Sequence, residues 1–188
     1  MKKKSILIFI AIISFSLFTS SAYAKPLVLF GTNLKSASRT SLESAIQKAG
    51  LIPIRQGFNY WCDSYKVTGQ LSGASRLDVC YTKNNRFANA QYIFSAFMNT
   101  ELVKHVINIV SDKYGNPSSI NGNYRLGDVT AFWYFGSNME IKIFRGWPSS
   151  TVYLNLRNKI NYQRFLYEYH KQKEARTAKK AKSESSAF

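Results

Sequence analysis

The chain has 188 residues, with 26 Lys and Arg against 10 Asp and Glu, two Cys, 45% hydrophobic and 15% aromatic residues. This composition excludes a disordered polymer, a multispan membrane protein and a large multidomain machine, because one long apolar run exists and the remainder suits a single compact domain. Composition alone does not identify a biochemical task.

The first 24 residues have the pattern of a secretory signal peptide. Three consecutive lysines precede an uncharged run of 13 residues, 6–18, and the small residues of an A-x-A cleavage site end at Ala24. The run is shorter than the stretch of about 20 residues that spans a membrane. We therefore expect a periplasmic or secreted protein that begins at Lys25 after cleavage following Ala24. No Cys stands at this junction, which disfavours a lipid-anchored lipoprotein.

The first half of the remaining chain shows one helix signal and several strand signals. An apolar run, residues 26–30, ends at Gly31 as a buried strand would. Thr40 and Glu43 fit a capping box, and apolar residues at helical spacing continue to Gly50, which predicts a short amphipathic helix. Three strands separated by Gly and Asn turns are expected at residues 56–67, 76–82 and 90–97.

The second half has the same order of elements. Thr100 can cap a helix that the Tyr-Gly-Asn-Pro sequence of residues 114–117 ends. Three strands are predicted at residues 129–135, 139–144 and 151–156. The glycines that end the two helices, Gly50 and Gly115, lie 65 residues apart. This spacing indicates two copies of an α-β-β-β unit, about residues 25–98 and 99–160.

These elements predict an α+β fold, with residues 25–160 forming one domain. Each three-stranded meander has one apolar face that needs a cover, and the preceding helix is the nearest apolar surface. We therefore expect an antiparallel sheet with the helices on one face and the other face free.

A further segment, residues 161–188, is predicted to be a C-terminal helix with a basic tail. Aromatic and apolar side chains at helical spacing give an amphipathic helix over residues 161–173, and residues 183–188 are expected to fray. The ordinary interpretation is that the aromatic stripe docks on the domain while the basic end stays solvated. The alternative is contact with an anionic surface. The candidate anion-binding residues are Lys171, Lys173, Arg176, Lys179, Lys180 and Lys182.

The two cysteines, Cys62 and Cys80, are expected to form a structural disulfide, because an exported chain meets oxidising conditions. A catalytic redox pair more typically has C-x-x-C spacing, which this pair lacks.

The free sheet face is the expected partner-binding surface, with Tyr60, Tyr65, Tyr134 and Trp147 as candidate contacts. The competing interpretation is that these rings are core residues or cross-strand pairs, because aromatic residues favour strands in general.

Residues 100–156 resemble a known module. The Tyr-Gly-Asn-Pro helix end and the later Ala-Phe-Trp-Tyr sequence of residues 131–134 look like the helix-then-three-strand module of small outer-membrane-assembly lipoproteins. Duplicated, the plan is similar to that of secreted β-lactamase-inhibitor proteins. The resemblance implies a non-enzymatic module that binds another protein through its sheet or loops. The chain departs from the lipoproteins because it lacks the lipidated Cys.

The sequence contains no recognisable catalytic motif. His105 and His170 stand apart in sequence, and no nucleophile elbow, metalloprotease or phosphate-loop pattern occurs. The acids are scattered singly, so no metal site and no cofactor are predicted. A carboxylate pair could still form in space. The candidates for it are Asp63, Asp78, Asp128 and Glu140, each also explained as a turn or surface charge.

Two functional hypotheses follow. The first is an exported non-enzymatic binding protein that engages an envelope or secreted protein through its aromatic sheet face, without a small-molecule cofactor. The second is a basic binder of polyanions or membrane surfaces that uses the Lys-rich tail on lipopolysaccharide, anionic lipid or DNA in transfer. A small hydrolase with a site assembled in space is a third, weaker hypothesis.

Overall fold

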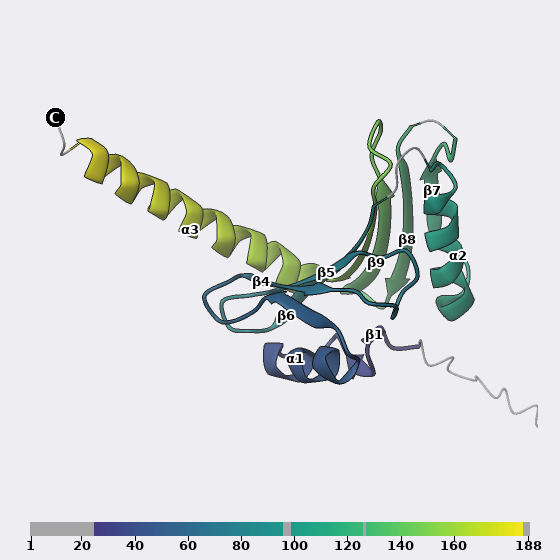
Figure 1. The fold of residues 1–188 in the computed structure, drawn as a ribbon, viewed down its shortest axis with the longest axis horizontal. Coiled ribbons are helices and arrows are strands. Elements are labelled where there is room, and N and C mark those ends of the chain that lie inside the picture. The colour runs from purple at the N-terminus through teal and green to yellow at the C-terminus, as the bar shows by residue number, and fades with distance from the viewer. Residues whose placement is uncertain (1–24, 96–98, 126, 186–188) are drawn as a thin grey trace, which may run out of the picture.

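The computed structural model describes residues 25–95, 99–125 and 127–185; the predicted signal peptide therefore lies outside the described residues. The fold is α+β, with one large antiparallel sheet, one two-stranded sheet and three helices in the described residues (Figure 1). The elements are β1 (Val28–Leu29), β2 (Thr32–Asn33), α1 (Arg39–Lys48), β3 (Ile52–Arg55), β4 (Cys62–Lys66), β5 (Arg76–Tyr81), β6 (Phe87–Phe94), α2 (Leu102–Tyr114), β7 (Ser119–Gly122), β8 (Val129–Phe135), β9 (Met139–Arg145), β10 (Val152–Asn158) and α3 (Lys159–Ser185).

The large sheet joins two similar halves. Its strand order is β3-β4-β5-β6-β10-β9-β8-β7, so each half contains a helix followed by four sequential strands. The last strands of the halves, β6 and β10, pair at the centre from Phe94 with Val152 to Asn89 with Arg157. The predicted duplicated plan is therefore present, but each unit is α-β-β-β-β because β3 and β7 add a fourth strand.

The two added strands lie at the sheet edges, which explains why their sequences gave no strand signal. All four residues of β3 are exposed and one is Pro53, so no apolar alternation marks it. The edge strand β7 reads Ser-Ile-Asn-Gly. A Cβ on Gly122 would overlap the carbonyl group of Asp128, so only glycine fits the end of this strand.

Several predicted boundaries shift in the structure. The capping box of α1 is formed by Ser38 and Ser41, not by Thr40 and Glu43, because Ser38 has the extended backbone of an N-cap and its hydroxyl accepts from the Ser41 N–H. The N-cap of α2 is Glu101 instead of Thr100, without a side-chain cap. The predicted 56–67 strand begins only at Cys62, because the preceding residues form a loop.

The helices α1 and α2 cover one face of the large sheet. Leu42 and Ile46 of α1 and Val103 and Val106 of α2 share one buried cluster with the inward side chains of the strands. The two-stranded β1-β2 sheet contributes Leu29 to the same cluster, so the predicted 26–30 strand is present only as a short separate ladder. The predicted arrangement of helices on one face is confirmed for α1 and α2.

The C-terminal helix α3 starts on the opposite face of the sheet and then leaves the body (Figure 1). Phe165 is 7% exposed and packs against Cys80 and Ala88. The helix continues to Ser185, so the predicted end at residue 173 and the predicted fraying of residues 183–185 are wrong, while residues 186–188 lie outside the described residues. Ala, Lys, Arg, Gln and Glu are strong helix formers, which accounts for the extension. Its 27 residues span about 40 Å.

Among the residues that the structure describes, no helix combines the length and the apolar character needed to cross a bilayer.

Candidate functional site

The second half of the large sheet has a face that α1 and α2 leave uncovered and that α3 meets only at its edge, where the Arg157 guanidinium lies 4.5 Å from the ring centroid of Tyr162. The α2 side of β8, β9 and β10 is core, whereas the side chains that alternate with the core residues point the other way. The first turns of α3 cover the corresponding surface over Cys80 and Ala88 in the first half. We call the uncovered surface the open face; it comprises Phe132, Tyr134, Lys142, Phe144, Tyr153, Asn155 and Arg157 with Gln91 of β6.

Aromatic rings and lysines alternate across the open face. Phe132 and Tyr134 are stacked, with ring centroids 5.9 Å apart. The Lys142 ammonium group lies 5.5 Å from the ring centroids of both Phe132 and Phe144, and Lys159 lies 5.7 Å from that of Tyr134. Such cation–π contacts hold the lysine stems along the rings while the charges stay at the surface.

Hydrogen bonds fix the floor of the open face. Asn155 is 2% exposed, and its side-chain oxygen accepts from the Gln91 amide at 2.9 Å. Arg157 donates to the Asn89 side chain at 3.2 Å and lies 3.8 Å from the Glu140 carboxylate. A shallow hollow of about 240 Å³ lies over these side chains. The floor is therefore ordered before any partner arrives.

The charge of the open face is positive. Lys142, Arg157 and Lys159 lie on or beside it, whereas Glu140 is 9% exposed and faces Arg157. Half-buried rings beside cations suit an acidic surface that also offers apolar area.

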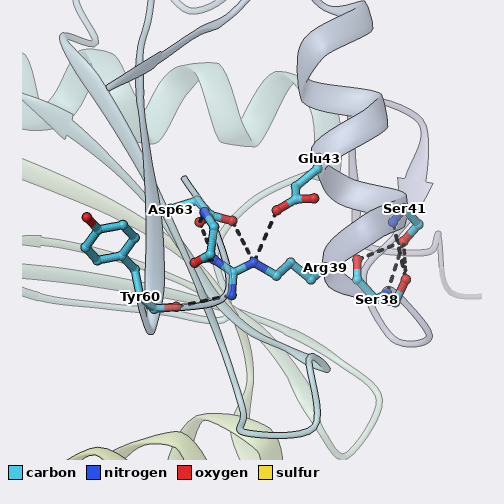
Figure 2. A network of polar contacts seen from close by, with 7 residues as sticks. Ser38, Arg39, Ser41, Glu43, Tyr60 and Asp63 are labelled. Atoms are coloured by element: carbon cyan, nitrogen blue, oxygen red, sulfur yellow. Dashed lines mark hydrogen bonds and ion pairs between the residues drawn. The ribbon is translucent and has the colours of Figure 1, made fainter. Parts of the chain in front are cut away.

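A buried ion pair holds the loop between β3 and β4, as Figure 2 shows. The Asp63 carboxylate contacts the Arg39 guanidinium twice, once at 3.1 Å to Nε, and accepts from the Gly57 N–H at 3.1 Å. Arg39 also donates to the carbonyl groups of Gly57 at 2.6 Å and Tyr60 at 3.1 Å, and to Glu43 at 3.2 Å. The Arg39 side chain of α1 thus fixes the loop between β3 and β4, at the β3 edge of the large sheet.

The electrostatics of this pair are those of a structural contact. Burial raises the pKa of the Asp63 carboxyl, while the Arg39 guanidinium and the Gly57 N–H oppose the rise. Both carboxylate oxygens have donors within the protein. We therefore assign Asp63 to loop positioning.

The other candidate carboxylates also have separate partners. Asp78 pairs with Arg76 at 3.0 Å, and Asp128 accepts from the Trp147 N–H at 2.7 Å. Glu140 faces Arg157. Within residues 25–95, 99–125 and 127–185, no three His, Cys, Asp or Glu side chains form a group that could hold a metal ion.

The four predicted partner contacts fall in different places. Tyr134 is 52% exposed on the open face, and Trp147 is 52% exposed in the loop that follows β9. Tyr60 is 46% exposed in the loop between β3 and β4. Tyr65 is fully buried, so its prediction as a surface contact is wrong. Side chains of β4 alternate between the two sheet faces, and Tyr65 lies on the helix-covered face, opposite to that of Cys62 and Ser64.

The predicted disulfide between Cys62 and Cys80 is present, with the residues directly opposite on β4 and β5. It lies beneath α3, against Trp61 and Phe165. Trp61 packs edge-on to Phe165, and its indole N–H donates to Gln172.

The predicted anion-binding residues all lie on the projecting part of α3. Each of them is exposed: Lys171, Lys173, Arg176, Lys179, Lys180 and Lys182. Glu184 lies 3.6 Å from Lys180.

Sequence reasoning missed most of the open face. Phe132, Lys142, Phe144 and Arg157 alternate with core residues in β8–β10, and that period of two was the available signal. This alternation predicted the strands, but it was not used to assign their side chains to the core face or to the exposed face. A buried arginine, Arg145, was also missed; it donates to four backbone carbonyls, two of them Thr100 and Tyr124.

Comparison with protein-family models gives no match, and comparison with curated proteins gives none either. Among solved structures, the chain is similar to the crystal structure of a DUF4309 family protein, YjgB, from Bacillus subtilis subsp. subtilis str. 168. The two chains are 17% identical, the similarity covers 73% of this chain and 90% of that chain, and the TM-score is 0.43.

Proposed function

We propose that this chain is an exported, non-enzymatic binding protein whose open face engages an acidic protein partner in the envelope or outside the cell. The observation that supports the proposal is the stack of Phe132 and Tyr134 flanked by Lys142 and Lys159 on an uncovered sheet face. The N-terminal sequence pattern and the disulfide support export.

The arrangement of the face supports a protein partner over a small molecule. Its rings and cations are spread over three strands, and its hollow of about 240 Å³ is smaller than a usual small-molecule site of about 300–1,000 Å³. Aromatic anchors on an ordered floor are features of protein interfaces, and the lysines give the face a positive potential that an acidic partner complements.

Site-specific photo-crosslinking tests this proposal. A photoreactive phenylalanine analogue replaces Tyr134 in one version of the protein and Tyr167 of α3 in the control, both of which are exposed. We expect a discrete adduct with an acidic protein from position 134 only, and its loss when Lys142→Glu is added. Absence of an adduct at 134, or the same adduct from both positions, contradicts the proposal.

A second function is favoured by one specific observation, the projecting part of α3. Its basic residues are exposed along a helix that extends away from the domain (Figure 1). A basic residue near an anionic membrane surface contributes about 1 kcal/mol. This alternative assigns the helix to phosphate groups of lipopolysaccharide, anionic lipid or DNA.

Co-sedimentation tests the alternative with vesicles of phosphatidylglycerol and phosphatidylcholine, and with DNA in a parallel arm. The alternative predicts binding that falls steeply with salt and weakens at least a hundredfold when the chain is stopped after His170. Unchanged binding by the truncated chain contradicts it.

A further inference from the structure

A cleft separates α3 from two loops of the first half of the sheet. The loop between β3 and β4, the turn between β5 and β6, and α3 enclose a cavity of about 590 Å³. Ligand sites for small molecules occupy about 300–1,000 Å³. The cleft therefore has the size of such a site, and its lining residues are separate from those of the open face.

The walls of the cleft are aromatic and largely uncovered. Phe58 is 71% exposed, Tyr60 46% and Tyr167 66%, and all three line the cavity together with Trp61. Exposed aromatic side chains that gather around one cavity form the kind of apolar patch that marks a ligand-binding groove. Their flat faces suit a planar apolar body.

The rim of the cleft is positive. Lys83 and Lys171 line it, and neither ammonium group is paired with a carboxylate in the part of the chain that the structure describes. The one acid of the lining, Glu168, accepts from the Lys83 N–H at 2.7 Å and from Arg164 at 2.8 Å, so its charge is already compensated. Two lysines without a carboxylate partner in the lining favour a ligand that carries an anionic group.

Hydrogen bonds hold the cleft in shape. Arg39 is 2% exposed and fixes the β3–β4 loop through the Gly57 and Tyr60 carbonyls (Figure 2). The Trp61 indole N–H, at the end of the same loop, donates to Gln172 and so joins the loop to α3. A rigid site loses less entropy on binding a ligand than a flexible one.

We propose that this cleft binds a small amphipathic anion, a molecule with a planar apolar body and one carboxylate, sulfonate or phosphate group. The body lies among Phe58, Tyr60 and Tyr167, and the anionic group lies near Lys83 and Lys171. This site is independent of the proposed protein-binding face.

Titration with anilinonaphthalene sulfonate, a planar fluorescent anion, tests the proposal on the purified protein. We expect saturable binding with one site, and energy transfer from tryptophan to the bound probe that Trp61→Phe reduces, since Trp61 alone of the three tryptophans lines the cleft. Lys83→Gln with Lys171→Gln should weaken binding at least tenfold, which corresponds to about 1.4 kcal/mol. Phenylnaphthylamine, the probe without the sulfonate, should bind the wild type and this variant equally.

The matched control replaces two lysines on or beside the open face, Lys142→Gln with Lys159→Gln. It should bind the probe as the wild type does. All variants are first compared by circular dichroism and thermal midpoint. A second cleft variant, Phe58→Ala with Tyr167→Ala, removes only exposed rings. Equal affinity of both cleft variants and the wild type, or a loss confined to the open-face control, overturns the proposal. Neither result bears on crosslinking at Tyr134.

Discussion

At the scale of single residues, buried polar side chains position the loops of this protein. Arg39 fixes the β3–β4 loop, and Arg145 binds the backbone carbonyls of Asn123, Tyr124 and Gly127 ahead of β8. Both arginines replace water around carbonyl groups that no strand pairs. The irregular loops are therefore part of the rigid body, which matters because one of them forms a wall of the cleft.

Removal of Arg39 tests this role. The Arg39 side chain is 3% exposed and that of Arg76, which pairs with Asp78, is 49% exposed. Arg39→Ala should lower the free energy of unfolding by about 3–5 kcal/mol, because it leaves the Asp63 charge buried without its partner. Arg76→Ala should lower it by less than about 1 kcal/mol. Urea unfolding measures both, and similar losses would contradict the role assigned to Arg39.

The buried tyrosines predict a loss of stability at alkaline pH. Burial raises the pKa of Tyr65, Tyr81 and Tyr92, so these phenols stay protonated in the folded state while the unfolded chain ionises near pH 10. The folded state then binds more protons, and the stabilisation, full below pH 10, falls as the pH rises further. Each tyrosine contributes about 1.4 kcal/mol per pH unit to this loss.

Tyr65→Phe separates this effect from other alkaline changes. The Tyr65 hydroxyl has no hydrogen-bond partner among the described residues, so the substitution should change stability at pH 8 by less than about 1 kcal/mol. Above pH 10, the unfolding free energy of the variant should fall less steeply than that of the wild type by about 1.4 kcal/mol per pH unit. Parallel curves from urea unfolding would refute the assignment.

At the scale of elements, the first turns of α3 form a second, smaller core with the disulfide. Phe165 is 7% exposed against Cys80, whereas Tyr167 two residues later is 66% exposed. Phe165→Ala should therefore reduce the free energy of unfolding by about 3–5 kcal/mol, and Tyr167→Ala by about 0.5 kcal/mol or less. Thermal and urea unfolding provide the comparison; equal effects would mean that α3 does not dock as described.

The disulfide should stabilise the same region. Cys62 and Cys80 are 18 residues apart, and the chain-entropy model gives about 3 kcal/mol for such a loop. Replacing both with Ala should lower the unfolding free energy by about that amount and increase amide exchange in the first turns of α3. Hydrogen exchange that stays unchanged in α3 would show that the bond and the helix are independent.

The elements predictable from sequence were those with strong periodicity. The strand β8 begins and ends where the apolar alternation predicts, at residues 129–135, and the helix α2 ends at Gly115 as its glycine predicts. The edge strands β3 and β7 could not be predicted, because exposed strands with Pro53 or an Asn-Gly end lack that alternation. The helix α1 begins at Arg39, earlier than predicted, because its capping box is formed by Ser38 and Ser41 and not by Thr40 and Glu43.

The candidate sites were harder to predict, because they depend on contacts between distant segments. The cleft brings Phe58 and Tyr60 against Tyr167 of α3, more than a hundred residues later in the chain. The sequence predicted Cys62 with Cys80, since only two cysteines exist, but not which sheet face α3 would cover.

At the scale of the whole molecule, the placement of three helices determines which surfaces remain for partners. The helices α1 and α2 cover one face of the sheet, and α3 covers part of the other before it projects into solvent (Figure 1). The open face over β8–β10 is what remains. We propose that this surface, and not the projecting helix, binds a protein partner.

The most direct test compares two matched double variants in pull-downs from crosslinked envelopes and medium. Tyr134→Ala with Lys159→Ala removes an exposed cation–π pair from the open face, and Tyr167→Ala with Lys171→Ala removes an equivalent pair from α3. We expect that an acidic protein recovered with the wild type is lost with the first variant and retained with the second. Retention with the first variant, or loss only with the second, would contradict it.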